Sequence, residues 1–91
     1  DAAAFALEIS GDSMSPLYRD GDRIIVDPTA RDFRRGDRVV VRTAGGEVMA
    51  KELVRLSADT VELASLNPDF PGRTLARKDV AWMARILWAS Q

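Results

Sequence analysis

Apolar and polar residues alternate with a period of two along most of the chain, and this pattern predicts β-strands. Turn residues separate the apolar runs, and Gly45-Gly46 between two such runs is a strong hairpin signal. Pro16 stands early in residues 14–19, the one place where a short helical turn is expected. The predicted strands are residues 5–9, 23–27, 38–42, 47–56, 61–66, 73–76 and 80–88.

The last of these segments is ambiguous. In a strand, Val80, Trp82, Ala84, Ile86 and Trp88 would share one face, but the Ala, Met and Leu content also suits a helix. We take the strand. The prediction is then an all-β domain of short, strongly bent antiparallel strands in a partly closed barrel, with at most one helical turn.

Length and composition fit a single globular domain over residues 1–91, because chains divide into several domains only at greater length. There are 13 basic and 14 acidic residues, and this net charge of −1 argues against direct binding to duplex DNA. We find no apolar run that would span a membrane and no signal-peptide pattern, so a cytoplasmic protein is expected. The first residue is not Met, and we expect an excised piece of a longer protein.

Histidine and cysteine are absent, which excludes disulfides, thiol catalysis and the His-based catalytic triad. Ser13 remains as a candidate nucleophile, because it follows a strand at a sharp turn where backbone N–H groups can converge on one point. Lys51 remains as a candidate base. By strand alternation it shares a face with Met49 and Leu53, and an apolar setting lowers the pKa of a lysine. A neutral lysine amine can take the proton of a serine hydroxyl.

Each of these residues also has an ordinary structural explanation. A serine before a helical turn is most often a cap, and a lysine in a strand usually keeps its charge in water. Asp12, beside Ser13, would hold a nearby lysine charged, or it would point outward and cap the following turn. The composition alone does not bring Ser13 and Lys51 together.

Five short motifs in order connect these residues to a known family. They are S-G-D-S-M-S-P at 10–16, D-G-D at 20–22, R-G-D-R-V-V-V at 35–41, M-A-K-E-L at 49–53 and L-N-P-D-F at 66–70. Together they resemble the C-terminal domain of LexA-type repressors. That family includes the UmuD proteins and phage-type repressors, and it is distantly similar to type I signal peptidases.

The resemblance covers residues 5–88 and implies a set of roles. Ser13 would be the nucleophile, Lys51 the general base, and the backbone N–H groups of Asp12 and Ser13 the oxyanion hole, with no cofactor and no metal. Such domains cut their own upstream linker, commonly after Ala or Cys and before Gly. The only Ala-Gly, Ala44-Gly45, lies in the predicted hairpin and is not taken as the site. The substrate segment is therefore missing, or the protein no longer cleaves. The family often has an apolar residue at the position of Asp12.

The resemblance implies the C-terminal dimerisation and self-cleavage domain of a bacterial-type transcriptional repressor. Operator DNA would be bound only by an absent N-terminal helix-turn-helix domain, and a RecA-type filament would be the trigger in an SOS response. Trp82 and Trp88 belong either to the core or to a homodimer surface formed by the C-terminal strand. One alternative is a non-catalytic dimerisation or sensing module. A signal peptidase-like enzyme is less favoured, because the chain has no membrane anchor.

The other charged residues have simpler explanations. The Asp residues at 20, 22, 32 and 37 suggest turn chemistry more than a metal site. The basic cluster of Arg31, Arg34 and Arg35 is predicted to be a solvated loop at this net charge. Lys78 is predicted to lie in a polar turn.

Overall fold

The computed structural model describes residues 4–11 and 13–89, which form seven strands and one short 3-10 turn. These elements are β1 (Phe5–Glu8), β2 (Arg23–Asp27), β3 (Arg38–Thr43), β4 (Val48–Leu56), β5 (Thr60–Ala64), β6 (Arg73–Ala76), η1 (Arg77–Asp79) and β7 (Val80–Ala89). In the described part of the chain, no helix is long and apolar enough to cross a membrane.

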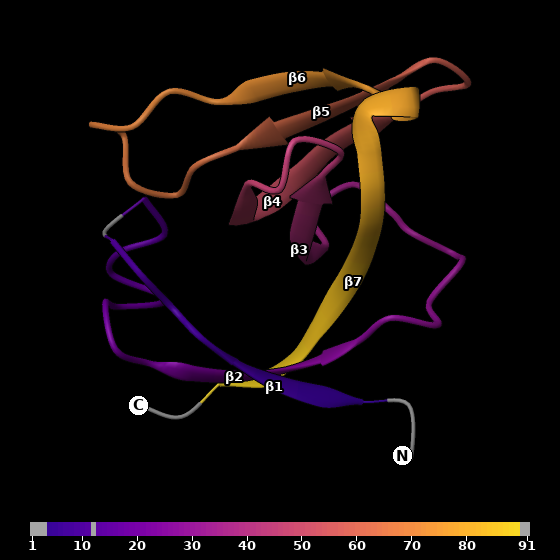
Figure 1. Ribbon diagram of the computed structural model, residues 1–91. Coiled ribbons are helices and arrows are strands. Elements are labelled where there is room, and N and C mark those ends of the chain that lie inside the picture. The colour runs from indigo at the N-terminus through magenta and orange to yellow at the C-terminus, as the bar shows by residue number, and fades with distance from the viewer. Residues whose placement is uncertain (1–3, 12, 90–91) are drawn as a thin grey trace.

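All seven strands belong to one sheet in the order β1-β2-β7-β3-β4-β5-β6, and every neighbouring pair is antiparallel. The last strand of the chain, β7, lies in the middle of the sheet, between β2 and β3. Figure 1 shows β7 as a long curved strand that runs from the β1–β2 pair to the group formed by β3–β6. The C-terminal strand therefore joins the N-terminal pair β1–β2 to the group β3–β6 in one sheet.

The predicted all-β class is confirmed, and the strands are strongly bent. Register shifts lie between Ile25 and Val26, where β2 meets β7, and between Arg42 and Thr43, where β3 meets β7. Such irregularities bend a strand and increase its twist. β1 and β6 have four residues each and pair on one side only, so within the described residues the sheet is not closed into a barrel.

Two apolar clusters lie on opposite faces of β3, because successive side chains in a strand point to opposite sides. Val40 belongs to the first cluster, whose other buried members are Ile9, Met14, Tyr18, Ile24, Val26 and Ala84. Val39 and Val41 belong to the second, with Leu53, Val61 and Leu63. The first cluster holds the turn that follows β1, and the second lies under β4–β6. The candidate site lies between the turn that follows β1 and the first half of β4.

Most local predictions hold, and the differences lie at strand ends and at the bulges of β7. The ambiguous last segment is a strand, β7, and Tyr18 N–H donates to Met14 O at 2.9 Å to close a single helical turn. β5 ends at Ala64, two residues earlier than expected. The prediction that Trp88 shares a face with Ala84 is wrong: Ala84 is fully buried, whereas Trp88 is 58% exposed and pairs with Ile25, which points to the other face from Val26. The cause is the bulge opposite Ile25 and Val26, which interrupts the alternation of β7 before Trp88.

Candidate active site

A cavity of about 430 Å³ lies between the turn after β1 and the first half of β4, and both Ser13 and Lys51 line it. These two residues are distant in the sequence and come from different elements. The rest of the wall is mostly apolar, with contributions from Leu7, Ile9, Met14, Val48, Met49 and Phe70. Among the described lining residues, Glu8 is the one that is acidic. The cavity therefore combines a hydroxyl and an amine with a surface that suits apolar side chains.

Ser13 lies in a turn that is held from several sides. Gly11 has a φ of +84°, a conformation that glycine adopts without strain, and its N–H donates to Asp20 Oδ1 at 2.8 Å. Directly after Ser13, the side chain of Met14 is only 2% exposed and fixes the start of the helical turn. Ser13 O accepts a hydrogen bond of 2.9 Å from Asn67 N–H. The serine backbone is thus fixed beside the cavity, while its side chain stays partly exposed. The second predicted oxyanion donor, the N–H of Asp12, lies outside the described residues.

Lys51 is buried in β4 with 7% of its surface exposed. It points to the same side of the strand as Met49 and Leu53, as alternation predicts, and it lies opposite Val39 of β3. Burial lowers the pKa of the Lys51 amine, Arg73 lowers it further, and Glu47 opposes both effects. A lysine in this state loses its proton more easily than one in water, which is what a general base requires.

The hydrogen-bond partner of Lys51 is a residue that the sequence did not indicate. Lys51 Nζ donates to Ser65 Oγ at 2.8 Å, and Ser65 Oγ donates to Pro71 O at 3.3 Å. In the described residues no hydrogen bond joins Lys51 to Ser13. Hydrogen bonds between catalytic groups are often long before substrate binds. Ser65 fixes the direction of the buried amine. Its signal would have been its place directly after Ala64, the last residue of β5, which pairs with Glu52 beside Lys51.

The loop between β5 and β6 contacts both candidate residues. Ser65, at its start, holds the Lys51 amine, and Asn67 N–H holds the carbonyl of Ser13. Phe70, 40% exposed, adds its ring to the cavity wall. Residues 65–70, which include the L-N-P-D-F segment noted in the sequence, thus connect the turn that carries the serine to the strand that carries the lysine.

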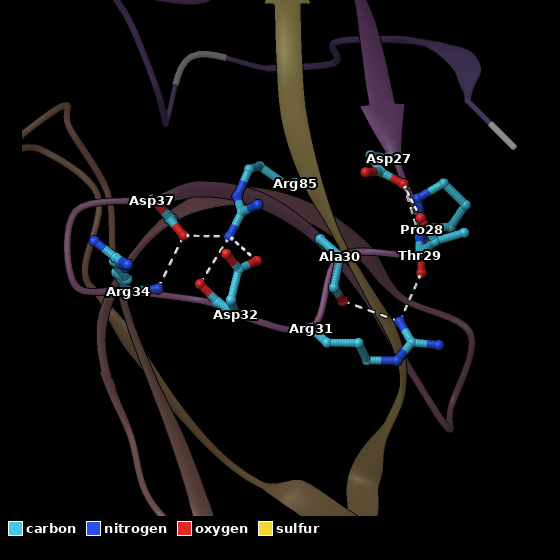
Figure 2. Close-up of polar contacts among 9 residues, drawn as sticks. All are labelled: Asp27, Pro28, Thr29, Ala30, Arg31, Asp32, Arg34, Asp37 and Arg85. Atoms are coloured by element: carbon cyan, nitrogen blue, oxygen red, sulfur yellow. Dashed lines mark hydrogen bonds and ion pairs between the residues drawn. The ribbon is translucent and has the colours of Figure 1, made fainter. Parts of the chain in front are cut away.

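The acidic residues considered as metal ligands have structural contacts instead. Asp20 and Asp22 accept backbone N–H groups of Gly11 and Arg19. Figure 2 shows the other two with Arg85 of β7, whose Nη2 contacts Asp37 Oδ2 at 3.0 Å and Asp32 Oδ1 at 3.2 Å. Within the described ranges, no group of three or more acidic residues is arranged to hold a metal ion.

Arg85, unlike Lys51, is in direct contact with two carboxylates. Its guanidinium lies over the ring of Phe33, 5.4 Å from the centroid, and also donates to Asp32 O at 3.0 Å. The hydrogen bond to Asp37 is the main cause that raises the pKa of Arg85. Arg31, in the same loop, donates to the carbonyls of Pro28 and Ala30 (Figure 2). This network fixes the loop between β2 and β3 and lies outside the cavity lining.

Comparison with known proteins agrees with the motifs. No curated protein sequence matches the chain significantly. A family model described as "Peptidase S24-like" matches residues 1–87, which is nearly the whole chain and includes both Ser13 and Lys51. This is the family of LexA- and UmuD-type C-terminal domains. The match and the all-β fold agree with each other, and the chain belongs to the Peptidase S24-like family.

Proposed function

We propose that this domain is a self-cleaving serine peptidase in which Ser13 is the nucleophile and Lys51 the general base. The observation that carries the proposal is the shared cavity. Ser13 and a lysine with only 7% of its surface exposed line the same apolar space, although they come from separate elements. Burial lowers the pKa of that lysine, so the neutral amine needed by the reaction is more accessible than in water.

The reaction uses these groups in two steps. The neutral Lys51 amine takes the proton from Ser13 Oγ while the oxygen attacks the carbonyl carbon of the scissile peptide bond. The Ser13 N–H stabilises the oxyanion, and Lys51 then gives the proton to the departing amine. The resulting ester is hydrolysed when Lys51 activates a water molecule, which restores the serine.

An extended peptide is the proposed substrate shape. β4 pairs with β3 from Val48 onward, but its pairing with β5 begins only at Glu52. The first half of β4 therefore presents one strand edge without a β5 partner, and its residues Val48–Lys51 line the cavity. A peptide strand can add to such an edge through main-chain hydrogen bonds. We propose that the upstream linker of the same protein binds in this way.

We further propose that the domain belongs to a cytoplasmic transcriptional repressor, whose separate DNA-binding part binds the operator and is released by cleavage. The two halves of a dimer would place two DNA-binding parts on one site. The end of β7 supports a homodimer surface there, because Leu87 and Trp88 are 54% and 58% exposed. Phe5 of β1, separated from β7 by β2, contacts Trp82 edge-to-face, with 6.0 Å between ring centroids. A RecA-type filament is the proposed trigger.

One observation favours a second candidate. The Lys51 amine is hydrogen-bonded to Ser65 and not to Ser13. A domain that senses a partner without cleaving would keep this arrangement permanently. The alternative function is therefore a non-catalytic dimerisation and sensing module.

Incubation of the full-length protein at pH 7 and pH 10 separates the two candidates. Cleavage should rise toward pH 10, because the lysine amine then loses its proton without assistance. Ser13→Ala and Lys51→Ala should each abolish it. Lys78→Ala is the matched control, since Lys78 is the other lysine of residues 1–91 and is exposed. Mass spectrometry of the fragments locates the bond. A full-length chain that stays intact at both pH values would favour the sensing module.

A further inference from the structure

An ion pair on the same side of the sheet as Lys51 has no role in the mechanism above. Arg73 of β6 binds Glu47, the residue before β4, with both arms of its guanidinium. The distances are 2.9 Å for Nη1–Oε2 and 3.2 Å for Nη2–Oε1. The two side chains are 39% and 53% exposed, so the pair lies at the surface. A bidentate contact of this kind fixes the position of both charges.

The strand register places this pair beside Lys51. Counting back by twos along β4, Lys51, Met49 and Glu47 lie on one side. Leu53 of β4 lies opposite Leu63 of β5, and Leu63 lies opposite Arg73 of β6, so Arg73 is on this side as well. Residues directly opposite each other in a sheet share a face. Arg73 and Glu47 therefore bring a positive and a negative charge to the face that carries the buried amine.

We propose that the Glu47–Arg73 ion pair sets the activity of Lys51 as a base, with Arg73 favouring the uncharged amine and Glu47 partly cancelling that effect. This inference rests on the proposed role of Lys51 in cleavage. A nearby positive charge makes protonation of an amine less favourable, and a nearby negative charge makes it more favourable. The balance between the two would set how much free base is present at neutral pH and so how fast the resting protein cleaves.

The other charged groups around Lys51 are placed differently. Glu52, the next residue in β4, points to the opposite side and lies opposite Arg38 of β3. The β3 residue opposite Lys51 is the uncharged Val39, and Glu8 of β1 lines the cavity. In β5, Glu62 lies opposite Arg55 of β4. Burial, Arg73 and Glu47 are the causes of the lowered pKa of Lys51.

The test compares two neutral variants, Arg73→Met and Glu47→Gln, with the wild type in the full-length protein. NMR of ¹³C-labelled lysine can follow the titration of Lys51, whose signal is assigned by its loss in Lys51→Arg, with Lys78 as an internal control. Arg73→Met should raise the Lys51 pKa and slow cleavage at pH 7 by about threefold, the size expected for one surface charge some ångströms away. Glu47→Gln should change both quantities in the opposite direction.

The opposite signs distinguish electrostatic control from a structural role. Either variant removes the same ion pair, so a purely structural ion pair would give effects of the same sign. Shifts in the same direction, or no shift in either variant, would overturn the proposal. The differences should also shrink in 0.5 M salt, since the pair is exposed to screening. Arg73→Lys is the second variant if Arg73→Met does not fold. It keeps the positive charge, so Lys51 should titrate as in the wild type. A Lys51 titration like that of a free lysine in this variant would overturn the proposal.

The NMR readout also separates this inference from the proposed function. Opposite shifts of the Lys51 titration in a protein that never cleaves would support the electrostatic control and contradict the peptidase function. Cleavage that depends on Lys51, with a titration indifferent to both variants, would support the peptidase function and overturn the control.

Discussion

Two cationic side chains flank Val39 of β3 on one face of the sheet, and their surroundings are opposite in kind. Val39 lies opposite Lys51 of β4 on one side and opposite Arg85 of β7 on the other. Lys51 is buried, and its hydrogen-bond partner is the neutral hydroxyl of Ser65. Arg85 is partly exposed and contacts two carboxylates, Asp32 and Asp37.

The electrostatic consequences are opposite as well. Burial lowers the pKa of Lys51, whereas the hydrogen bond to Asp37 raises the pKa of Arg85. A cation that is satisfied by carboxylates stabilises the fold and is chemically inert. A cation that is buried without a carboxylate contact costs stability and gains reactivity. Of the two cations that lie opposite Val39, Arg85 therefore has a structural role, and Lys51 has the surroundings that suit a base.

Exchanging the two cation types should give the largest effect. Lys51→Arg keeps the positive charge, but a guanidinium does not give up its proton at any working pH. We expect self-cleavage to fall by at least about 10³-fold, with no rescue at pH 10. Arg85→Lys should cleave within about twofold of wild type, because Arg85 lies outside the cavity. Fragment yields on gels between pH 7 and pH 10 measure both. Cleavage by Lys51→Arg would remove Lys51 from the role of base.

Removing the neutral partner of Lys51 should have the next largest effect. Ser65→Ala leaves the amine without the acceptor that fixes its direction, and we expect cleavage to slow by about tenfold, within the usual range for groups that support proton transfer. Ser65→Thr keeps a hydroxyl and should recover most of the rate. Ser57→Ala is the matched control, since the Ser57 hydroxyl contacts Thr60 at the distant turn. Equal losses in Ser65→Ala and Ser65→Thr would indicate a packing role only.

The position of Ser65 also shows where prediction from the sequence ends. Alternation correctly located the strands and put Lys51 on the side of Leu53, and the motifs singled out Ser13. The partner of Lys51 depends on the register between β4 and β5. That register shifts at Val54, between Leu53 and Arg55. Continued from Leu56↔Val61 without the shift, the ladder would pair Glu52 with Ser65. With the shift, Glu52 pairs with Ala64, and Ser65 follows one residue beyond, on the side of Lys51.

Trp88 gives the same lesson at the other end of the sheet. Strict alternation put it on a face with Ala84, but the bulge opposite β2 turned it outward. A bulge adds one residue to a strand and reverses the faces of everything after it. Its position depends on how two distant strands fit together, so local patterns along the sequence do not specify it. The strand locations were predictable from the sequence, whereas the cross-strand partner and the face of a residue beyond a bulge were not.

The Arg85 network should affect stability and leave cleavage nearly unchanged. Arg85→Met removes the contacts to both carboxylates and the Phe33 ring, and we expect a loss of about 1–2 kcal/mol in the free energy of unfolding, since the pair with Asp37 is only partly screened by water. Asp32→Ala should cost less than about 0.5 kcal/mol, because the Asp32 side chain is 78% exposed. Urea denaturation measures both. A larger loss from Asp32→Ala than from Arg85→Met would contradict this division.

The pH dependence of stability provides the finest comparison. Lys51 has a lower pKa in the folded protein than an unfolded lysine, so the folded state is penalised at every pH below the folded pKa. The penalty disappears as pH rises from the folded pKa toward the unfolded value of about 10.4. Lys51→Met should therefore stabilise the protein at pH 7 by about 1 kcal/mol, a common gain when a destabilising buried residue is replaced.

That advantage should shrink toward pH 10, and the difference between the two proteins is the quantity to measure. Burial raises the pKa of Tyr18, and its ionisation at high pH affects wild type and Lys51→Met alike, so it cancels in the difference. Thermal melts at pH 7, 8.5 and 10 supply the values. If Lys51→Met were less stable than wild type by the same amount at all three, the lysine would contribute to folding as Arg85 does, and the contrast across Val39 would be lost.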